Sequence, residues 1–203
     1  MTEDLSSKLF SSLSDSGIQG RIEDLVPLTG GASKEIWKFN LVDSTESTKM
    51  IFRRGAQGES SLAIKTADEA KIQEEVSKTG VSVPQIIFVS NDSKLGDAYV
   101  MKFIEGETIP RKILRDERFK SALPLLANQC GEEIAKIHNT PLDNLQFLPK
   151  KSSKALVEDL YLLYESYKQP SPVFEYAYRW LKEQDFGNFE DSLVHGDFRL
   201  GNI

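Results

Sequence analysis

The sequence has little cysteine and no long apolar stretch. Cys130 is its one cysteine, so no disulfide can form within the chain, which fits the reducing environment of the cytoplasm. No run approaches the roughly 18 consecutive apolar residues that indicate a membrane-spanning helix. The N-terminal string MTEDLSSKLFSSLSDSG carries Glu3 and Asp4 and lacks the basic start and apolar core of a secretory signal. We therefore expect a cytoplasmic protein without a membrane partner.

Basic residues and histidines are scarce as well. The 25 basic and 31 acidic residues leave a formal net charge of −6. Because contacts to phosphates dominate the affinity for nucleic acids, an acidic chain without a basic stripe is not expected to bind DNA or RNA. Two histidines and one cysteine also argue against a zinc site.

The hydrophobic pattern of the first half predicts a β-rich unit that begins with a helix. Residues 4–14 have leucines at helical spacing. Three strands are expected within residues 22–54, followed by a helix over residues 61–78. Two further β-rich runs lie at residues 86–92 and 97–104. The order after the first helix is therefore β-β-β-α-β-β.

The second half predicts helices instead of strands. Amphipathic periodicity runs through residues 121–139, 154–168 and 172–184. We therefore divide the chain into a β-rich N-terminal lobe, residues 1–104, and a partial helical C-terminal lobe, residues 105–203. This arrangement belongs to the α+β class.

A glycine pair lies between the first two predicted strands. Gly30 and Gly31 allow backbone N–H groups to approach a phosphate, and Ser33 adds a hydroxyl donor. The same pair fits an ordinary hairpin turn, and the G-K-[ST] ending of a Walker A loop is absent.

Two arginines end the third predicted strand. Arg53 and Arg54 must face opposite ways on a strand, so only one of them can point into a cleft. Kinases place a cation at this point, which pairs with nucleotide phosphates and with a Glu on the following helix. Glu69 is the natural partner of Arg53, although most glutamates in so polar a helix are solvated surface charges.

The run YVMKFIEG, residues 99–106, links the two predicted lobes. A strand that leaves one lobe for the other exposes unpaired backbone groups, which match the donors and acceptors on the edge of an adenine ring. An ordinary buried strand with a glycine stop fits this segment equally well.

The most specific motif is LVHGDFRLGNI at the C-terminal end. Asp197 follows His195 and Gly196, and Asn202 comes after four further residues, an H-G-D-x-x-x-x-N pattern. Protein kinases carry H-R-D-x-x-x-x-N, in which the Asp accepts the proton of the substrate hydroxyl and the Asn holds magnesium. The competing structural interpretation makes Asp197 a turn residue in a glycine-containing loop.

Taken in order, these motifs resemble the aminoglycoside phosphotransferase-like kinases, also called the phosphotransferase enzyme family, which includes choline-kinase-like members. The matching strings are LTGGASKEIWKF, IFRRG, TGVSVPQII, YVMKFIEG, EEIAKIHNTPL and LVHGDFRLGNI. Arginine in the string IFRR resembles the subgroup related to kinase domains attached to acyl-CoA dehydrogenases. The resemblance implies a two-lobed, protein-kinase-like fold that moves the γ-phosphoryl group of ATP to a hydroxyl of a small molecule, with Mg2+ as the metal.

The resemblance also implies how ATP would be held. Gly30, Gly31 and Ser33 would cover the phosphates. The remaining nucleotide contacts would come from the third strand, its helix partner and the linking strand. Arg53 would contact the phosphates while pairing with Glu69, and the backbone of Lys102 and Ile104 would hold adenine.

The C-terminal loop would carry the chemistry. By resemblance, Asp197 would orient or deprotonate the acceptor hydroxyl, and Asn202 would ligate magnesium. His195 would brace the loop.

The family pattern implies a second metal-binding Asp soon after Asn202, followed by further helices, whereas this sequence ends at Ile203. We therefore expect little or no activity from the chain alone, and self-association through uncovered surface of the helical lobe. The alternative function is a non-catalytic, regulatory nucleotide-binding module. The acceptor stays open among antibiotics, choline-like compounds, sugars, amino acids and hydroxy-acyl compounds.

Overall fold

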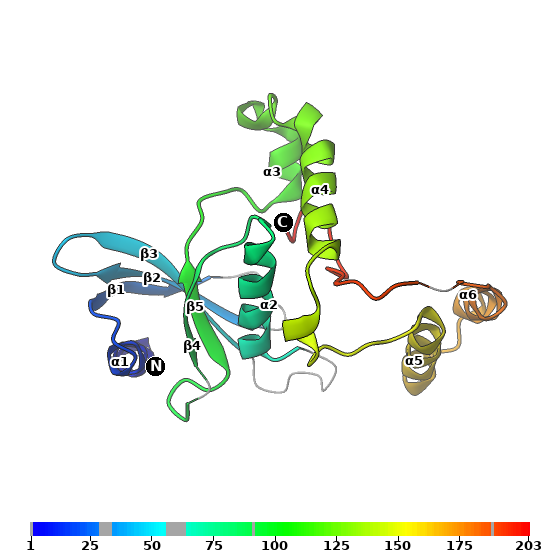
Figure 1. Cartoon of the computed structure of the whole chain (residues 1–203), viewed down its shortest axis with the longest axis horizontal. Coiled ribbons are helices and arrows are strands. Elements are labelled where there is room, and N and C mark those ends of the chain that lie inside the picture. Colours follow the sequence, from blue (N-terminus) through cyan, green and yellow to red (C-terminus); the bar gives the residue numbers. More distant parts are fainter. Residues whose placement is uncertain (1, 29–33, 56–63, 91, 188) are drawn as a thin grey trace. The chain divides into compact units, whose positions relative to one another are not determined.

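The computed structural model describes residues 2–28, 34–55, 64–90, 92–187 and 189–203. Its helices and strands follow one another as Figure 1 shows. In chain order they are α1 (Thr2–Asp15), β1 (Arg21–Pro27), β2 (Lys34–Val42), β3 (Ser47–Gly55), α2 (Thr66–Lys78), β4 (Ile86–Ser90), β5 (Ala98–Lys102), α3 (Pro110–Arg115), η1 (Glu117–Phe119), α4 (Leu123–His138), η2 (Asp143–Leu145), α5 (Ser153–Ser166) and α6 (Pro172–Lys182).

The predicted order of strands and helices is confirmed in the β-rich half. The helix expected over residues 61–78 begins only at Thr66, since residues 64 and 65 are described and are not helical. Sequence patterns missed α3, a helix of 6 residues that begins at Pro110.

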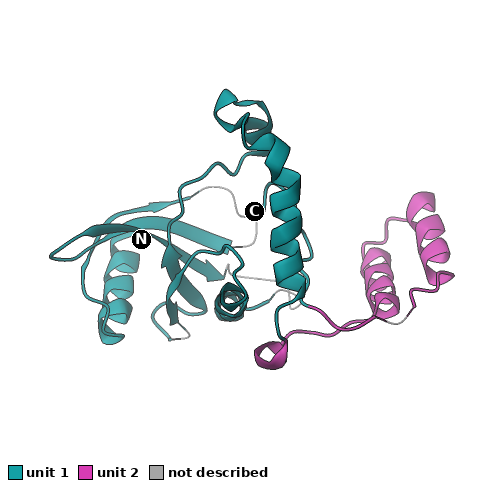
Figure 2. Ribbon diagram, turned by 45° about the horizontal axis from the view of Figure 1, so that its top comes forward, with its two compact units in different colours: residues 1–141, 193–203 teal, residues 142–192 magenta. Residues whose placement is uncertain are grey.

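The chain forms two compact units, coloured separately in Figure 2. One contains residues 1–141 together with residues 193–203, and the other contains residues 142–192. The first unit therefore joins the β-rich part, α3 and α4 to the C-terminal motif. A division into two lobes after residue 104 remains a prediction.

The five strands form one antiparallel sheet in the order β1-β2-β3-β5-β4. The strand β3 lies in its centre, where Arg53 is opposite Ile36 on β2 and Tyr99 on β5. Because side chains alternate along a strand, these three residues share one face of the sheet.

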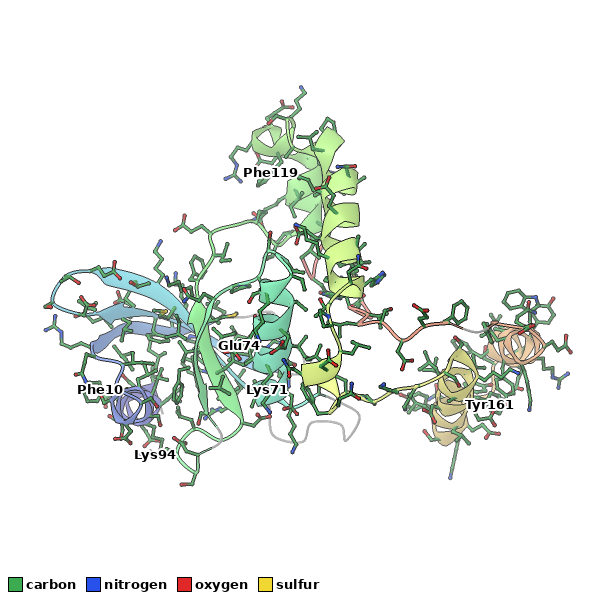
Figure 3. The ribbon with its side chains drawn as sticks, in the orientation of Figure 1. Phe10, Lys71, Glu74, Lys94, Phe119 and Tyr161 are labelled. Atoms are coloured by element: carbon green, nitrogen blue, oxygen red, sulfur yellow. The ribbon has the colours of Figure 1, made fainter. Side chains whose placement is uncertain are left out.

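The opposite face of the sheet packs on α1. Apolar residues of the helix and of the sheet meet there in one buried cluster, which contains Leu5, Leu9, Leu13, Trp37, Phe39, Met50, Phe52, Leu95, Ala98 and Val100. Polar contacts add to this packing: Lys94, in the β4–β5 connection, donates to Ser11 and Asp15 on α1 at 2.9 and 2.7 Å (Figure 3). The helix is thereby fixed on both its apolar and its polar side.

The face that carries Arg53 is covered by α2. The Nε2 amide of Gln73 donates to the phenolic oxygen of Tyr99 at 3.0 Å. Burial raises the pKa of Tyr99, with the Arg53 charge acting in the opposite direction. In Figure 1, α1 and α2 lie on opposite sides of the sheet.

The first turn of α2 is capped from outside the helix. Lys65, the N-cap residue, offers no side-chain acceptor. Instead the carboxylate of Asp97 accepts hydrogen bonds from the backbone N–H groups of Thr66 and Ala67, at 2.6 and 2.7 Å. These bonds satisfy donors that every helix start leaves without intrahelical partners.

In the second unit, α5 and α6 pack through tyrosines. The rings of Tyr161 and Tyr178 stack with their centroids 3.6 Å apart. Many large apolar side chains of these two helices stay exposed, among them Leu156, Leu160, Leu162, Val173, Phe174, Tyr176 and Trp180. Self-association through such surface remains a prediction. Within the described ranges, no helix combines the length and apolar character that crossing a membrane requires.

Candidate active site

Arg53 and Glu69 form the ion pair expected from the sequence. The Nε atom of Arg53 lies 3.1 Å from Oε2 of Glu69. This Nε is buried and its N–H makes no hydrogen bond of good geometry, so the contact is an ion pair rather than a directed hydrogen bond. Arg54 points to the opposite face and pairs with Glu35 there. The predicted register of the strand is therefore confirmed.

A second cation, Lys34, contacts the same carboxylate. Its Nζ lies 3.4 Å from Oε1 of Glu69, donates to Oγ1 of Thr66 at 3.0 Å, and donates to the backbone oxygen of Ile64 at 3.3 Å. Only 6% of the Lys34 side chain is exposed. Sequence reasoning missed this residue, because a lysine in a polar stretch is expected at the surface.

Strand geometry explains why the two cations meet. Lys34 lies opposite Gly55, and Ile36 lies opposite Arg53, so Lys34 and Arg53 are diagonal neighbours on one face. The alternation along β2 was therefore the one signal in the sequence that could have indicated Lys34.

The adenine hypothesis concerns the backbone of Lys102, which ends β5, and of Ile104 shortly after it. The N–H of Lys102 already donates to the oxygen of Gln85 at 2.9 Å, and the N–H of Phe103 to the oxygen of Lys49 at 3.0 Å. Among the described residues, Ile104 has no such partner, and its side chain is exposed. Gly30, Gly31 and Ser33 lie outside the described residues.

An open pocket of about 490 Å³ lies beside this segment. Its lining combines basic, acidic and aromatic side chains: Lys38, Lys49, Phe103, Glu105, Gly106, Glu107, Arg118 and Phe119. Glu105 pairs with Lys49 inside it. Of the predicted site residues that the structure describes, none lines this pocket.

The C-terminal loop brings Asp197 and Asn202 together. The Nδ2 amide of Asn202 donates to Oδ2 of Asp197 at 2.6 Å and to its backbone oxygen at 2.9 Å. Gly196 has φ +80°, a conformation that glycine adopts without strain and that turns the chain before Asp197. The two motif residues are therefore neighbours in space.

Arg199 is a further member of this loop, and sequence reasoning missed it. Its Nε lies 3.1 and 3.2 Å from the two carboxylate oxygens of Asp197. A Cβ at Gly201 would come within 2.9 Å of Nη1 of Arg199, so the glycine leaves room for the guanidinium. Arg199, followed by Asn202, holds the pKa of Asp197 below its ordinary value through hydrogen bonds to the carboxylate. Asp197 is therefore ionised near neutral pH.

His195 contacts the loop rather than the carboxylate. Its ring meets that of Phe198 edge-on, with centroids 5.4 Å apart, and its Nδ1 accepts a long hydrogen bond, 3.4 Å, from the N–H of Asp197. These contacts agree with a bracing role for His195.

The Asp197–Asn202 pair has the chemistry that magnesium prefers. Mg2+ takes carboxylate and carbonyl oxygens and commonly keeps several waters, so few protein ligands are needed. Asn202 can supply its amide oxygen to the metal, and the carboxylate of Asp197 lies beside it. In the part of the chain that the structure describes, no group of three or more His, Cys, Asp or Glu residues could hold a metal ion.

Comparison with known proteins identifies the family. The sequence profile of the phosphotransferase enzyme family matches residues 24–203. The chain belongs to the phosphotransferase enzyme family. The match confirms the family that the ordered motifs predicted. It begins at residue 24, so α1 lies outside the matched region.

The chain is also similar to two curated proteins and to a solved kinase structure. Two curated relatives, from Pongo abelii and Homo sapiens, are named acyl-CoA dehydrogenase family member 11. Each is 28% identical over an aligned region of 147 residues, and the match covers 66% of this chain and 18% of the relative. An ethanolamine kinase from Plasmodium vivax superposes with a TM-score of 0.51 at 16% identity, over 89% of this chain and 48% of that kinase. At such identity the likeness shows the fold, which is the mixed α/β, kinase-like fold with a β-rich N-terminal part.

Proposed function

We propose that this phosphotransferase-family chain uses ATP and Mg2+ to transfer the γ-phosphoryl group to a hydroxyl of a small molecule. The observation that carries the proposal is the contact between Asp197 and Asn202 within the H-G-D-x-x-x-x-N motif. Neither residue is needed merely to hold adenine, so their presence in the motif favours transfer over binding alone. The chain spans 48% of the ethanolamine kinase and 18% of the curated relatives. That a whole protein containing this chain is an active kinase is therefore part of the proposal.

The roles in nucleotide binding follow from where the cations and backbone groups lie. Of the two cations that contact Glu69, Lys34 and Arg53, the side chain of Arg53 is 30% exposed and is the one that a phosphate can reach. The backbone at Lys102 and Ile104 would contact adenine. Gly30, Gly31 and Ser33, which join β1 to β2, would cover the phosphates.

The roles in chemistry belong to the C-terminal loop. Asp197 would accept the proton of the attacking hydroxyl, and its ionised state suits a base. Asn202 would bind magnesium through its amide oxygen. When bound, the metal would neutralise charge that develops on the transferred phosphoryl group.

Binding is the first test. The purified 203-residue chain should give a saturable calorimetric signal with Mg-ATP, which should weaken when Arg53→Met removes the exposed cation. If millimolar Mg-ATP gives neither heat nor a thermal shift, the proposal is wrong.

Transfer is the second test. ADP release is measured with a panel of aminoglycosides, amino alcohols, sugars, amino acids and hydroxy-acyl compounds. For any acceptor that supports turnover, Asp197→Asn should lower the rate by about 10²- to 10⁴-fold and leave the affinity for ATP almost unchanged. Asp191→Asn is the matched control, because Asp191 and Asp197 are both 64% exposed and both pair with a cation. Turnover that Asp197→Asn leaves unchanged would overturn the proposed role of Asp197.

A further inference from the structure

Lys34 is the one residue of the cation cluster that no motif indicated. It begins β2 and lies in contact with Glu69, which in turn contacts Arg53. We propose that Lys34 is a positioning residue, which fixes the carboxylate of Glu69 and shares its charge, so that Arg53 keeps positive charge for a phosphate group. This inference rests on the proposed nucleotide-binding function.

The contacts of Glu69 show how the charge is shared. Oε1 lies 3.4 Å from Lys34, and Oε2 lies 3.1 Å from Arg53. Each cation therefore has its own carboxylate oxygen, and the carboxylate cannot turn fully toward Arg53 without leaving Lys34. With Lys34 absent, Glu69 would be free to neutralise Arg53 alone.

Exposure separates the roles of the two cations. The Lys34 side chain is 6% exposed and that of Arg53 is 30% exposed, so Arg53 is the one that a ligand can reach. Lys34 is instead held inside by Thr66 and by the backbone oxygen of Ile64.

The exposed cation of the cluster favours an anion as its ligand. Arg53 is 30% exposed, and a guanidinium binds phosphate oxygens through charge-assisted hydrogen bonds. A phosphate group offers such oxygens, whereas adenosine carries no charge.

The experiment compares ligands that differ in charge. Calorimetry on the 203-residue chain measures the Kd of Mg-ATP and of adenosine for the wild type, Lys34→Met and Lys34→Gln. We expect both variants to weaken Mg-ATP binding by about 10-fold and adenosine binding by less than about 2-fold. Lys34→Gln keeps donors for Thr66 and Ile64 while removing the charge, so it carries the same expectation if the methionine variant does not fold. Lys34→Arg should restore part of the affinity for Mg-ATP.

A double-mutant cycle with Glu69→Gln tests whether Lys34 acts through Glu69. In the Glu69→Gln background, Lys34→Gln should change the Kd of Mg-ATP by less than about 2-fold, because no carboxylate charge remains to be shared. Lys78→Gln is the matched control, since Lys78 ends α2 and its side chain is 62% exposed. It should leave both affinities unchanged.

The outcomes separate this inference from the proposed function. Equal Mg-ATP affinity in the wild type and Lys34→Gln overturns the positioning role while the proposed function stands. An equal loss for Mg-ATP and adenosine also overturns it, because that result indicates a structural role only. A wild type that does not bind Mg-ATP overturns the proposed function and this inference with it.

Discussion

Replacing Asp97 with alanine should loosen the start of α2, the helix that carries Glu69. The Asp97 carboxylate accepts hydrogen bonds of 2.6 and 2.7 Å from the N–H groups of Thr66 and Ala67. Both of these residues are buried, so water cannot readily replace the lost acceptor. Lys65 supplies no substitute cap.

The expected loss can be worked out from these contacts. Removing a helix cap costs about 1 kcal/mol. A carboxylate at a helix N-terminus contributes roughly 0.3–1 kcal/mol through the helix dipole. Leaving a buried N–H without a partner costs about 1–3 kcal/mol. Because these contributions overlap, we expect Asp97→Ala to lower the free energy of unfolding by about 2–3 kcal/mol, and Asp97→Asn, which keeps one acceptor oxygen, by about 1 kcal/mol.

Urea denaturation gives the free energy of unfolding, and hydrogen exchange reports on the amides of α2. Asp68→Asn is the matched control, because Asp68 lies in the first turn of α2. This substitution removes the same charge and leaves the Asp97 cap intact. The affinity for Mg-ATP should fall with Asp97→Ala, since Glu69 loses its fixed position. A loss below about 0.5 kcal/mol, or one equal to that of Asp68→Asn, would refute the capping argument.

Two further predictions concern the core and the C-terminal loop. Leu9→Ala should destabilise the chain by about 3 kcal/mol, because it opens a cavity where a fully buried leucine of α1 meets the sheet. Thermal unfolding measures this loss, and an unchanged unfolding temperature would contradict the packing of α1. Arg199→Gln should raise the pKa of Asp197 toward its ordinary value, since the guanidinium favours the carboxylate. The pH at which the rate falls on the acidic side should therefore rise. The midpoint of the pH titration of the Asp197 carboxyl carbon, followed by its chemical shift, should rise as well. An unmoved midpoint would show that Arg199 does not act on Asp197.

Periodicity in the sequence determined much of the β-rich part. Alternation with a period of two placed Arg53 and Arg54 on opposite faces, and helical spacing placed Glu69 on the element that follows. These patterns are local, because the geometry of a strand or a helix fixes which neighbours share a face. The prediction of the Arg53–Glu69 pair combined these patterns with the kinase pattern, in which a strand cation pairs with a Glu on the following helix.

Short elements escaped the sequence patterns. The helix α3 has 6 residues, RKILR preceded by Pro110, and buries none of them. A segment this short cannot show a repeated apolar face, and its two apolar residues fit a loop equally well. The helix α2 begins later than the sequence pattern predicted for a different reason. The residue that caps its first turn, Asp97, comes from another part of the chain.

The sequence by itself determined the family and the order of the strands with α1 and α2, and it placed Asp197 and Asn202 in one motif, because motif spacing and periodicity are local features of the chain. Only the tertiary structure decided that Lys34 is buried and that Asp97 caps α2. Lys34 meets Thr66 across 32 positions, and Thr66 meets Asp97 across 31. A charged side chain is buried only where distant acceptors surround it, and those acceptors come together only when the sheet and α2 have folded against each other.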